Sequence, residues 1–312
     1  MISRRTLLMQ SCAAPMLLHA AKGNTEIGFA TGTYGMKTMS TADALRTLAE
    51  IGYDGVELCF IPGWPTDPAK LSASDRKDLR KLIGDTGLAV PAILESIPYG
   101  TTPEKRARNI EHLKMSVALC NELVPSNPPV VDSILGGKSA DWEKVKGQLV
   151  DEVGEWGKVA DAAKVTVCFK AHADQAVDSP ERSIWLLKQV NNPRIRFIYD
   201  YGHFFLEGFS LADSLKQMLP YTAFISVKDS ARTPDGKHVY LLPGDGKTDY
   251  LEYFRLLKEL HYNGYVGVEV SALIHNKPGY EPVPTARLCY ERLAPLMAKA
   301  NIKRPRRVTH KG

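Results

Sequence analysis

The stretch Phe197-Ile198-Tyr199-Asp200-Tyr201-Gly202-His203 decides how this sequence is interpreted. An apolar run that ends abruptly in Asp and continues with Gly and His is typical of a buried strand whose last side chains emerge at its carboxyl end. Ligands of α/β folds bind at that end of the strands. We therefore expect Asp200 and His203 to mark the floor of an active site. For this pair alone, a strand followed by a polar turn is the alternative.

Seven further apolar runs alternate with helical segments, and several of them also end in ionisable residues. These runs lie at residues 27–30, 55–59, 88–95, 129–132, 165–170, 223–229 and 266–270. Helical patterns lie at residues 41–51, 72–86, 103–122, 142–163, 180–190 and 283–300. This alternation fits one α/β domain, a single closed (β/α)8 TIM barrel over residues 23–300, better than a division into two domains.

The composition, with 44% hydrophobic and 24% charged residues in a chain of 312, is typical of a soluble globular protein. No stretch after the amino terminus reaches the roughly 18 uninterrupted apolar residues of a membrane span. The formal net charge of +5 resides at the two ends of the chain, so it does not indicate a nucleic-acid partner. We expect the basic segment 301–312 to be a disordered tail.

The amino terminus, residues 1–22, resembles a twin-arginine export signal. Arg4 and Arg5 directly precede a moderately apolar run, and the small residues Ala20 and Ala21 lie near its end. We therefore expect the twin-arginine translocase as a partner, and a periplasmic or otherwise exported location. The alternative is an unprocessed start of a cytoplasmic protein.

In a barrel of this kind the carboxyl ends of all the strands converge on one mouth. The chemically active residues at these ends are Glu57, Glu95, Asp132, Lys170, His172, Asp200, His203, Ser226, Lys228, Asp229 and Glu269. Burying an unpaired charge is costly, so these side chains must be paired, liganded or turned toward a water-filled pocket. For Glu57, Asp132 and Asp229, helix capping or pairing with a lysine is the alternative. For Lys228 it is an internal ion pair.

Two further features have a structural interpretation. The segment Gly244-Asp245-Gly246 is similar to part of a phosphate loop, but it lacks the Gly-Lys-Ser/Thr ending. We predict a turn there, with Asp249 near the start of a helix. Tyr34, Trp64 and Tyr99 are candidates for the aromatic wall of a sugar pocket, with core or loop packing as the alternative.

Five segments carry a resemblance to a known family. They are V-T-V-C-F-K-A-H (165–172), F-I-Y-D-Y-G-H (197–203), F-I-S-V-K-D-S-A-R (224–232), L-L-P-G-D-G-K-T-D-Y (241–250) and N-G-Y-V-G-V-E-V (263–270). From about residue 27 to 297 the chain resembles the xylose-isomerase-like barrel superfamily of sugar phosphate isomerases and epimerases. In the epimerases of this group, the resemblance implies, a divalent metal (Mn, Mg or Zn) is held by Glu, Asp, His and Glu from strands five to eight. The two Glu residues also shuttle a proton at the substrate carbon.

Two of these four ligand positions are matched here. Asp200 and Glu269 correspond to the second and the fourth, whereas Lys170 stands where the first Glu is expected and Ser226 where the His is expected. An ammonium group repels a dication, and a hydroxyl is a poorer ligand for Mn²⁺ or Zn²⁺ than imidazole. A metal on Asp200 and Glu269 is therefore one expectation. A charge-balanced cluster in which Lys170 replaces the metal is the other.

We expect an enzyme that isomerises or epimerises a small-molecule sugar or polyol, or eliminates next to a keto group, after removing a proton alpha to a carbonyl. Burial is expected to lower the pKa of Lys170 and make it a general base or a polarising acid, with Glu269 as its catalytic partner. The substrate-binding candidates are His172, His203, Arg232, Lys228 and Glu57. The alternative is a catalytically degenerate barrel that binds a carbohydrate without turning it over. The sequence leaves open whether the chain forms a homodimer.

Overall fold

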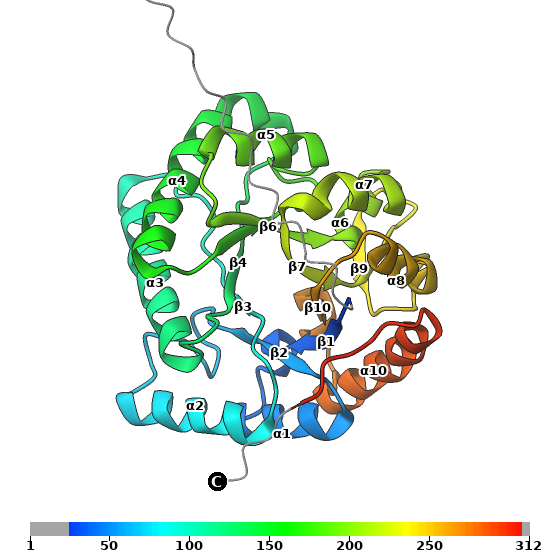
Figure 1. Ribbon diagram of the computed structural model, residues 1–312. Helices are drawn as coiled ribbons and strands as arrows, with labels where there is room; N and C mark the ends of the chain where they lie inside the picture. Colours follow the sequence, from blue (N-terminus) through cyan, green and yellow to red (C-terminus); the bar gives the residue numbers. More distant parts are fainter. Residues whose placement is uncertain (1–24, 308–312) are drawn as a thin grey trace, which may run out of the picture.

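Eight parallel strands close into a barrel, and helices surround it (Figure 1). The computed structural model describes residues 25–307. Neighbouring strands follow the order β1-β10-β7-β6-β5-β4-β3-β2, so the single (β/α)8 TIM-barrel prediction is confirmed. The barrel strands are β1 (Ile27–Gly32), β2 (Gly55–Cys59), β3 (Ala92–Leu94), β4 (Val130–Ile134), β5 (Val167–Lys170), β6 (Ile195–Asp200), β7 (Thr222–Val227) and β10 (Gly264–Val268).

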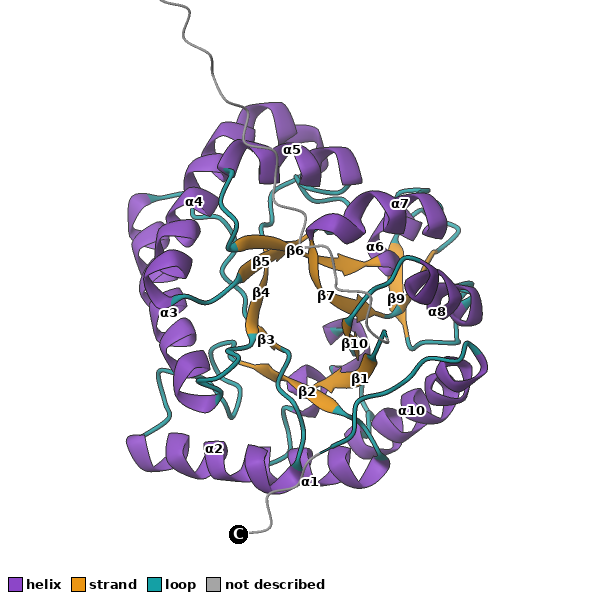
Figure 2. Cartoon of the chain, viewed as in Figure 1, coloured by secondary structure: helices purple, strands orange, loops and turns teal. Residues whose placement is uncertain are grey.

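The long helices form the outer ring seen in Figure 2. They are α1 (Thr41–Ile51), α2 (Ala73–Thr86), α3 (Pro103–Leu123), α4 (Trp142–Ala163), α5 (Pro180–Val190), α7 (Leu211–Met218), α8 (Tyr250–Glu259) and α10 (Pro282–Lys299). Side-chain caps fix where several of these helices start. The side chains of Ser40, Ser72 and Ser179 each accept a hydrogen bond from the backbone N–H of the residue three positions later. Within residues 25–307, none of the helices combines the length and the apolar character needed to cross a membrane.

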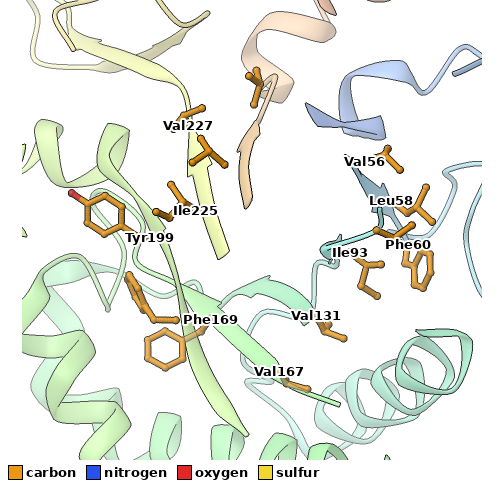
Figure 3. Packing of buried hydrophobic residues seen from close by; sticks show 14 of the residues in the cluster. Val56, Leu58, Phe60, Ile93, Val131, Val167, Phe169, Tyr199, Ile225 and Val227 are labelled. Atoms are coloured by element: carbon orange, nitrogen blue, oxygen red, sulfur yellow. The ribbon is translucent and has the colours of Figure 1, made fainter. Parts of the chain in front are cut away.

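Side chains alternate between two faces along each strand, and the two faces have different partners. The outward face belongs to one large apolar cluster shared with the helices, and Figure 3 labels ten of its members on or beside the strands, from Val56 to Val227. Inward-facing Ala92, Cys168, Ile198 and Phe224 form a separate apolar plug inside the barrel. On three of these strands, the inward-facing residue that follows the plug residue toward the carboxyl end is polar.

Glycines make room for the large rings inside the barrel. A Cβ at Gly28 would lie 2.2 Å from the ring of Tyr265, and one at Gly267 would lie 2.5 Å from the ring of Phe224. Both contacts are shorter than real atoms allow, so the plug depends on these two glycines. The plug fills the barrel beneath the polar end.

Several elements were not predicted, among them helix α7 of the outer ring and three short elements that follow strands β6 and β7. Strands β8 (Asp229–Arg232) and β9 (His238–Leu241) form an antiparallel hairpin directly after β7. Helix α6 (Tyr201–Leu206) starts at the end of β6, where the Asp200 carboxylate accepts the Gly202 N–H at 3.0 Å. The hairpin and α6 both lie beside the mouth of the barrel, because they follow the ends of its strands.

The basic tail is attached to the barrel as far as residue 307, so the prediction of a disordered tail is wrong for this part. The Ile27 N–H donates to the Lys303 carbonyl at 2.9 Å. Arg304 donates twice to the carboxylate of Asp54, at 2.7 and 2.9 Å. Asp54 is buried, and a buried carboxylate needs such a partner. Residues 308–312 and the predicted export signal at 1–22 lie outside the described residues.

Candidate active site

Six ionisable side chains meet at the carboxyl end of the barrel, and we call them the mouth cluster. They are Glu57 (β2), Asp132 (β4), Lys170 (β5), Asp200 (β6), Lys228 (just after β7) and Glu269 (just after β10). Five of them are almost completely buried, whereas the Glu269 side chain is 12% exposed. Glu269 is therefore the member of the cluster that reaches solvent most.

The Glu269 carboxylate joins the two lysines. Lys170 Nζ donates to one of its oxygens at 2.5 Å, and Lys228 Nζ donates to the other at 3.0 Å. On the far side of each lysine lies a further carboxylate: Asp132 Oδ2 is 3.2 Å from Lys170 Nζ, and Lys228 donates to Asp200. Three carboxylates and two ammonium groups thus alternate across the mouth.

This alternation fixes the charge of Lys170 and Glu269. Burial opposes a charge on Lys170, but the facing carboxylates of Asp132 and Glu269 outweigh it and hold the pKa of Lys170 well above its ordinary value. Burial likewise opposes ionisation of Glu269, but Lys170 and Lys228 hold the pKa of Glu269 well below its ordinary value. The predicted lowering of the Lys170 pKa is therefore wrong. The raised pKa keeps Lys170 an ammonium donor at neutral pH.

Glu57 and Asp132 have pKa values on either side of neutrality. Burial, with a contribution from the charge of Asp132, raises the pKa of Glu57 to about 8. Burial raises the pKa of Asp132 to about 6, against the opposing attraction of Lys170. Within the described residues, Glu57 Oε1 and Asp132 Oδ1 accept no hydrogen bond. Both carboxyl groups are consequently suited to proton exchange near pH 7.

Two neutral imidazoles stand beside the cluster. The rings of His172 and His203 lie 3.9 Å apart between centroids, and His203 Nε2 lies 3.6 Å from Asp200 Oδ2. Burial and the charge of Lys228 lower the pKa of His172 to about 4. Burial and the neighbouring His172 lower the pKa of His203 well below its ordinary value. Both predicted substrate-binding histidines therefore lie at the mouth in their uncharged form.

Tyr240 of the hairpin is a site neighbour that the sequence did not reveal. Its hydroxyl lies 3.2 Å from His203 Nδ1, and Lys228 Nζ lies 5.1 Å from the centre of its ring. Recognising it requires the β8–β9 hairpin, which has no apolar periodicity to signal it. The hairpin thus adds a wall to the mouth.

Arg232 is held away from the mouth cluster by other partners. Its guanidinium donates to the carbonyls of Leu206 and Gly236, each at 3.1 Å, and lies 3.4 Å from Asp174 and from Glu207. These contacts join the hairpin to α6 and to the loop after β5. Substrate binding by Arg232 stays a prediction, and none of these contacts supports it.

Two other strand-end carboxylates have structural partners. Glu95 lies 2.7 Å from His112 Nε2 on α3. Asp229 accepts the backbone N–H groups of Gly244 (2.7 Å), Gly246 (3.1 Å) and Thr248 (3.3 Å). The next turn starts α8, with Asp249 as its N-cap, so the predicted helix start is confirmed. The amides of this loop are engaged by a carboxylate of the protein itself.

An aromatic group lies near the cluster. Tyr34 stacks on Trp64 with 5.3 Å between ring centres, and the ring of His275 meets Tyr34 edge-on at 4.7 Å. Burial, followed by the charge of Glu269, raises the pKa of Tyr34 to about 12. Tyr99 instead packs partly buried against the main core.

The cluster does not fit a divalent metal. A metal shared by Asp200 and Glu269 would have to lie where Lys228 Nζ already contacts both carboxylates. Ser226 Oγ, at the expected histidine position, is buried without a hydrogen-bond partner among the described residues and is a weak ligand. Over residues 25–307 no three His, Cys, Asp or Glu side chains are arranged to hold a metal ion. The metal assignment to Asp200 and Glu269 is thus not supported by the donor set.

Comparisons with known proteins agree with this fold. A sequence model of the xylose isomerase-like TIM barrel family matches residues 45–284. The chain is 23% identical over 159 residues to an inosose dehydratase of Geobacillus kaustophilus, covering 46% of this chain and 50% of the relative. It is 23% identical over 159 residues to a D-psicose 3-epimerase of Ruminiclostridium cellulolyticum, covering 50% of each. The matched region thus spans about half the length of these curated relatives.

A solved structure extends the match to nearly the whole barrel. The crystal structure of an IolI protein with a bound zinc atom has a TM-score of 0.71 and 19% sequence identity, covering 88% of this chain and 99% of that one. This likeness concerns the fold. The zinc belongs to that protein.

Proposed function

Because the chain belongs to the xylose isomerase-like TIM barrel family, we propose that it is an enzyme that isomerises, epimerises or dehydrates a carbohydrate or polyol by first removing a proton alpha to a carbonyl. The observation that carries this proposal is the mouth cluster, in which proton-exchanging carboxyl groups lie beside buried ammonium donors. Relatives described as a dehydratase and a 3-epimerase support the same class of chemistry.

Asp132, Lys170 and Glu57 each carry out one step of the proposed reaction. Asp132, ionised at neutral pH, accepts the proton as the C–H bond alpha to the carbonyl breaks. The electron pair of that bond forms the C=C bond of an enolate, whose oxygen accepts a hydrogen bond from the Lys170 ammonium. Glu57, protonated at neutral pH, returns a proton. Reprotonation of the same carbon on its other face gives an epimer. Reprotonation of the former carbonyl carbon gives an isomer when the hydroxyl proton on the alpha carbon moves to the former carbonyl oxygen, and departure of a β-hydroxyl with the Glu57 proton as water gives an elimination product.

The mouth favours an uncharged substrate. Four carboxyl groups surround two ammonium groups, so an additional anionic group would meet a net negative site. The loop most similar to a phosphate site directs three of its N–H groups at Asp229 instead. Stacked Tyr34 and Trp64 offer an apolar surface of the kind that packs against sugar C–H groups. We propose a non-phosphorylated keto sugar or keto polyol.

Export by the twin-arginine translocase to the periplasm is a separate part of the proposal, and it rests on the sequence alone. Replacing Arg4 and Arg5 together by Lys keeps the charge but removes the paired guanidinium groups that the receptor reads. Cell fractionation should then find the chain shifted to the cytoplasm. An unchanged distribution would contradict export by this route.

Solvent exchange tests the proposed chemistry. Purified full-length protein is incubated in deuterated water with ketoses and with 3-keto-glycosides, and deuterium at the carbon alpha to the carbonyl is measured by NMR. We expect uptake with at least one substrate and a loss of about 10²–10⁴-fold in the Asp132→Asn variant. The proposal fails if no substrate takes up deuterium, or if Asp132→Asn takes up deuterium at the rate of the wild type.

A catalytically inactive sugar-binding barrel is the second candidate. The observation in its favour is that Asp200 and Glu269 are both engaged by lysines, at positions where the family resemblance implies catalytic metal ligands. Titration calorimetry together with the deuterium experiment distinguishes the enzyme from the inactive barrel. A pure binder would bind the sugar, take up no deuterium and form no new product.

A further inference from the structure

We propose that the ammonium groups of Lys170 and Lys228 together replace the divalent metal, so that the reaction needs no metal ion. This inference rests on the proposed function, since it names the groups that hold the developing negative charge. It goes further by assigning Lys228 to catalysis jointly with Lys170.

The position of the two ammonium groups is central. Each lysine contacts a different oxygen of Glu269, so both nitrogens face one carboxylate that is itself partly open to solvent. Lys170 enters from β5 and Lys228 from the end of β7, on opposite sides of β6 in the barrel order. A substrate oxygen that approaches Glu269 therefore meets a positive group on either side.

The total charge of the two lysines matches that of the divalent metal ion that they replace. Two ammonium groups carry the same formal charge as one divalent cation. Three carboxylates hold them in place, and the side chains of Lys170 and Lys228 are only 3% and 1% exposed. In such a buried site a fixed charge acts more strongly than in water, which is the property needed to stabilise an enolate oxygen.

Each lysine also keeps a donor in reserve. An ammonium group has three N–H donors and no acceptor. Among the described residues, Lys170 contacts the carboxylates of Glu269 and Asp132, and Lys228 contacts those of Glu269 and Asp200. One N–H of each lysine is left for a substrate oxygen. The carbonyl oxygen of a keto sugar, which becomes the enolate oxygen when the alpha C–H bond breaks, accepts both.

Metal binding is measured first, because it needs no substrate. Elemental analysis of the purified full chain and calorimetric titration with Mn²⁺ should find no stoichiometric metal. The triple variant Lys170→Glu, Ser226→His, Lys228→Met restores four ligand positions and should bind about one Mn²⁺. The matched control Lys170→Gln, Ser226→Ala, Lys228→Met removes the same ammonium groups without adding ligands and should bind none. Circular dichroism establishes that both variants are folded.

Solvent exchange then tests the lysines directly. Lys228→Met should slow deuterium uptake by about 10²–10³-fold with little change in KM, as expected when one donor to an oxyanion is lost. Lys228→Arg, which keeps the charge, should recover part of the rate, and added Mn²⁺ should recover none in Lys228→Met. One equivalent of metal in the wild type, or exchange that is lost on chelation and restored by Mn²⁺, would overturn the inference. If the wild type exchanges no substrate, the proposed function fails, while the Mn²⁺ titration still decides whether the lysines exclude a metal.

Discussion

Lys170 and Lys228 donate to different oxygens of one carboxylate, that of Glu269. This arrangement explains how two buried lysines remain side by side, because Glu269 separates their charges and Asp132 and Asp200 balance them from outside. The carboxylate is therefore a structural requirement of the site. Its removal has consequences that can be measured without any substrate.

The Glu269→Gln variant should be strongly destabilised. A neutral amide leaves two buried ammonium groups without their shared counter-ion, which we expect to cost about 3–5 kcal/mol in the free energy of unfolding. Urea denaturation at pH 7 measures the loss. The control is Glu155→Gln, which removes an exposed partner of Lys158 and should change stability by less than about 0.5 kcal/mol. Equal stability of the two variants would contradict the bridging role.

Turnover should have a bell-shaped dependence on pH. Asp132 must be ionised to accept a proton, so kcat/KM should rise as pH increases through about 6. Glu57 must be protonated to donate, so kcat/KM should fall as pH increases through about 8. In Glu57→Gln the alkaline limb should disappear while a reduced activity remains. Persistence of that limb in Glu57→Gln would assign it to another group.

Glu57 should also make stability depend on pH in an unusual direction. Its pKa is higher in the folded chain, about 8, than the ordinary 4.5, so between these values the folded state binds a proton that the unfolded state has lost. Its contribution to stability is therefore greatest at low pH and declines as pH rises from about 4.5 to 8. Glu57→Gln removes this contribution. Thermal unfolding at pH 5 and pH 9 should find the variant gaining stability relative to wild type as pH increases.

The loop held by Asp229 should loosen in Asp229→Asn. An amide offers one acceptor oxygen where the carboxylate accepts three N–H groups, so we expect a loss of about 1–3 kcal/mol. Hydrogen exchange should accelerate at residues 244–248. Asp249→Asn is the matched control, because Asn caps a helix about as well as Asp and should leave exchange there unchanged. Unaltered exchange in Asp229→Asn would contradict the anchoring role.

The sequence was sufficient for the barrel because each barrel strand and most of the long helices carry their own local signal. The run ending in Asp200 is apolar up to its last residue, and Ser40, Ser72 and Ser179 cap helices where the periodicity begins. The β8–β9 hairpin escaped prediction because its strands are four residues each and carry no alternating pattern. The sequence therefore did not indicate Tyr240 as a neighbour of the site.

The sequence predicted which residues meet at the site, but it did not predict the pKa shift of Lys170. That Lys170, Asp200 and Glu269 meet at one mouth follows from their places at strand ends. The direction of the pKa shift of Lys170 depends on the distance of its ammonium group from Asp132 and Glu269. These residues belong to other strands, so no local sequence pattern encodes that distance. The same limit applies to the tail, because the Arg304 and Asp54 side chains pair across most of the chain length.

The central claim is that this mouth removes a proton alpha to a carbonyl with lysine ammonium groups in place of a metal. NMR in deuterated water, on full-length wild-type protein treated with a chelator and shown by elemental analysis to be metal-free, tests it most directly. We predict that deuterium enters the alpha carbon of an uncharged keto sugar at the same rate before and after chelation. Deuterium uptake that disappears on chelation and returns with Mn²⁺ would contradict the claim.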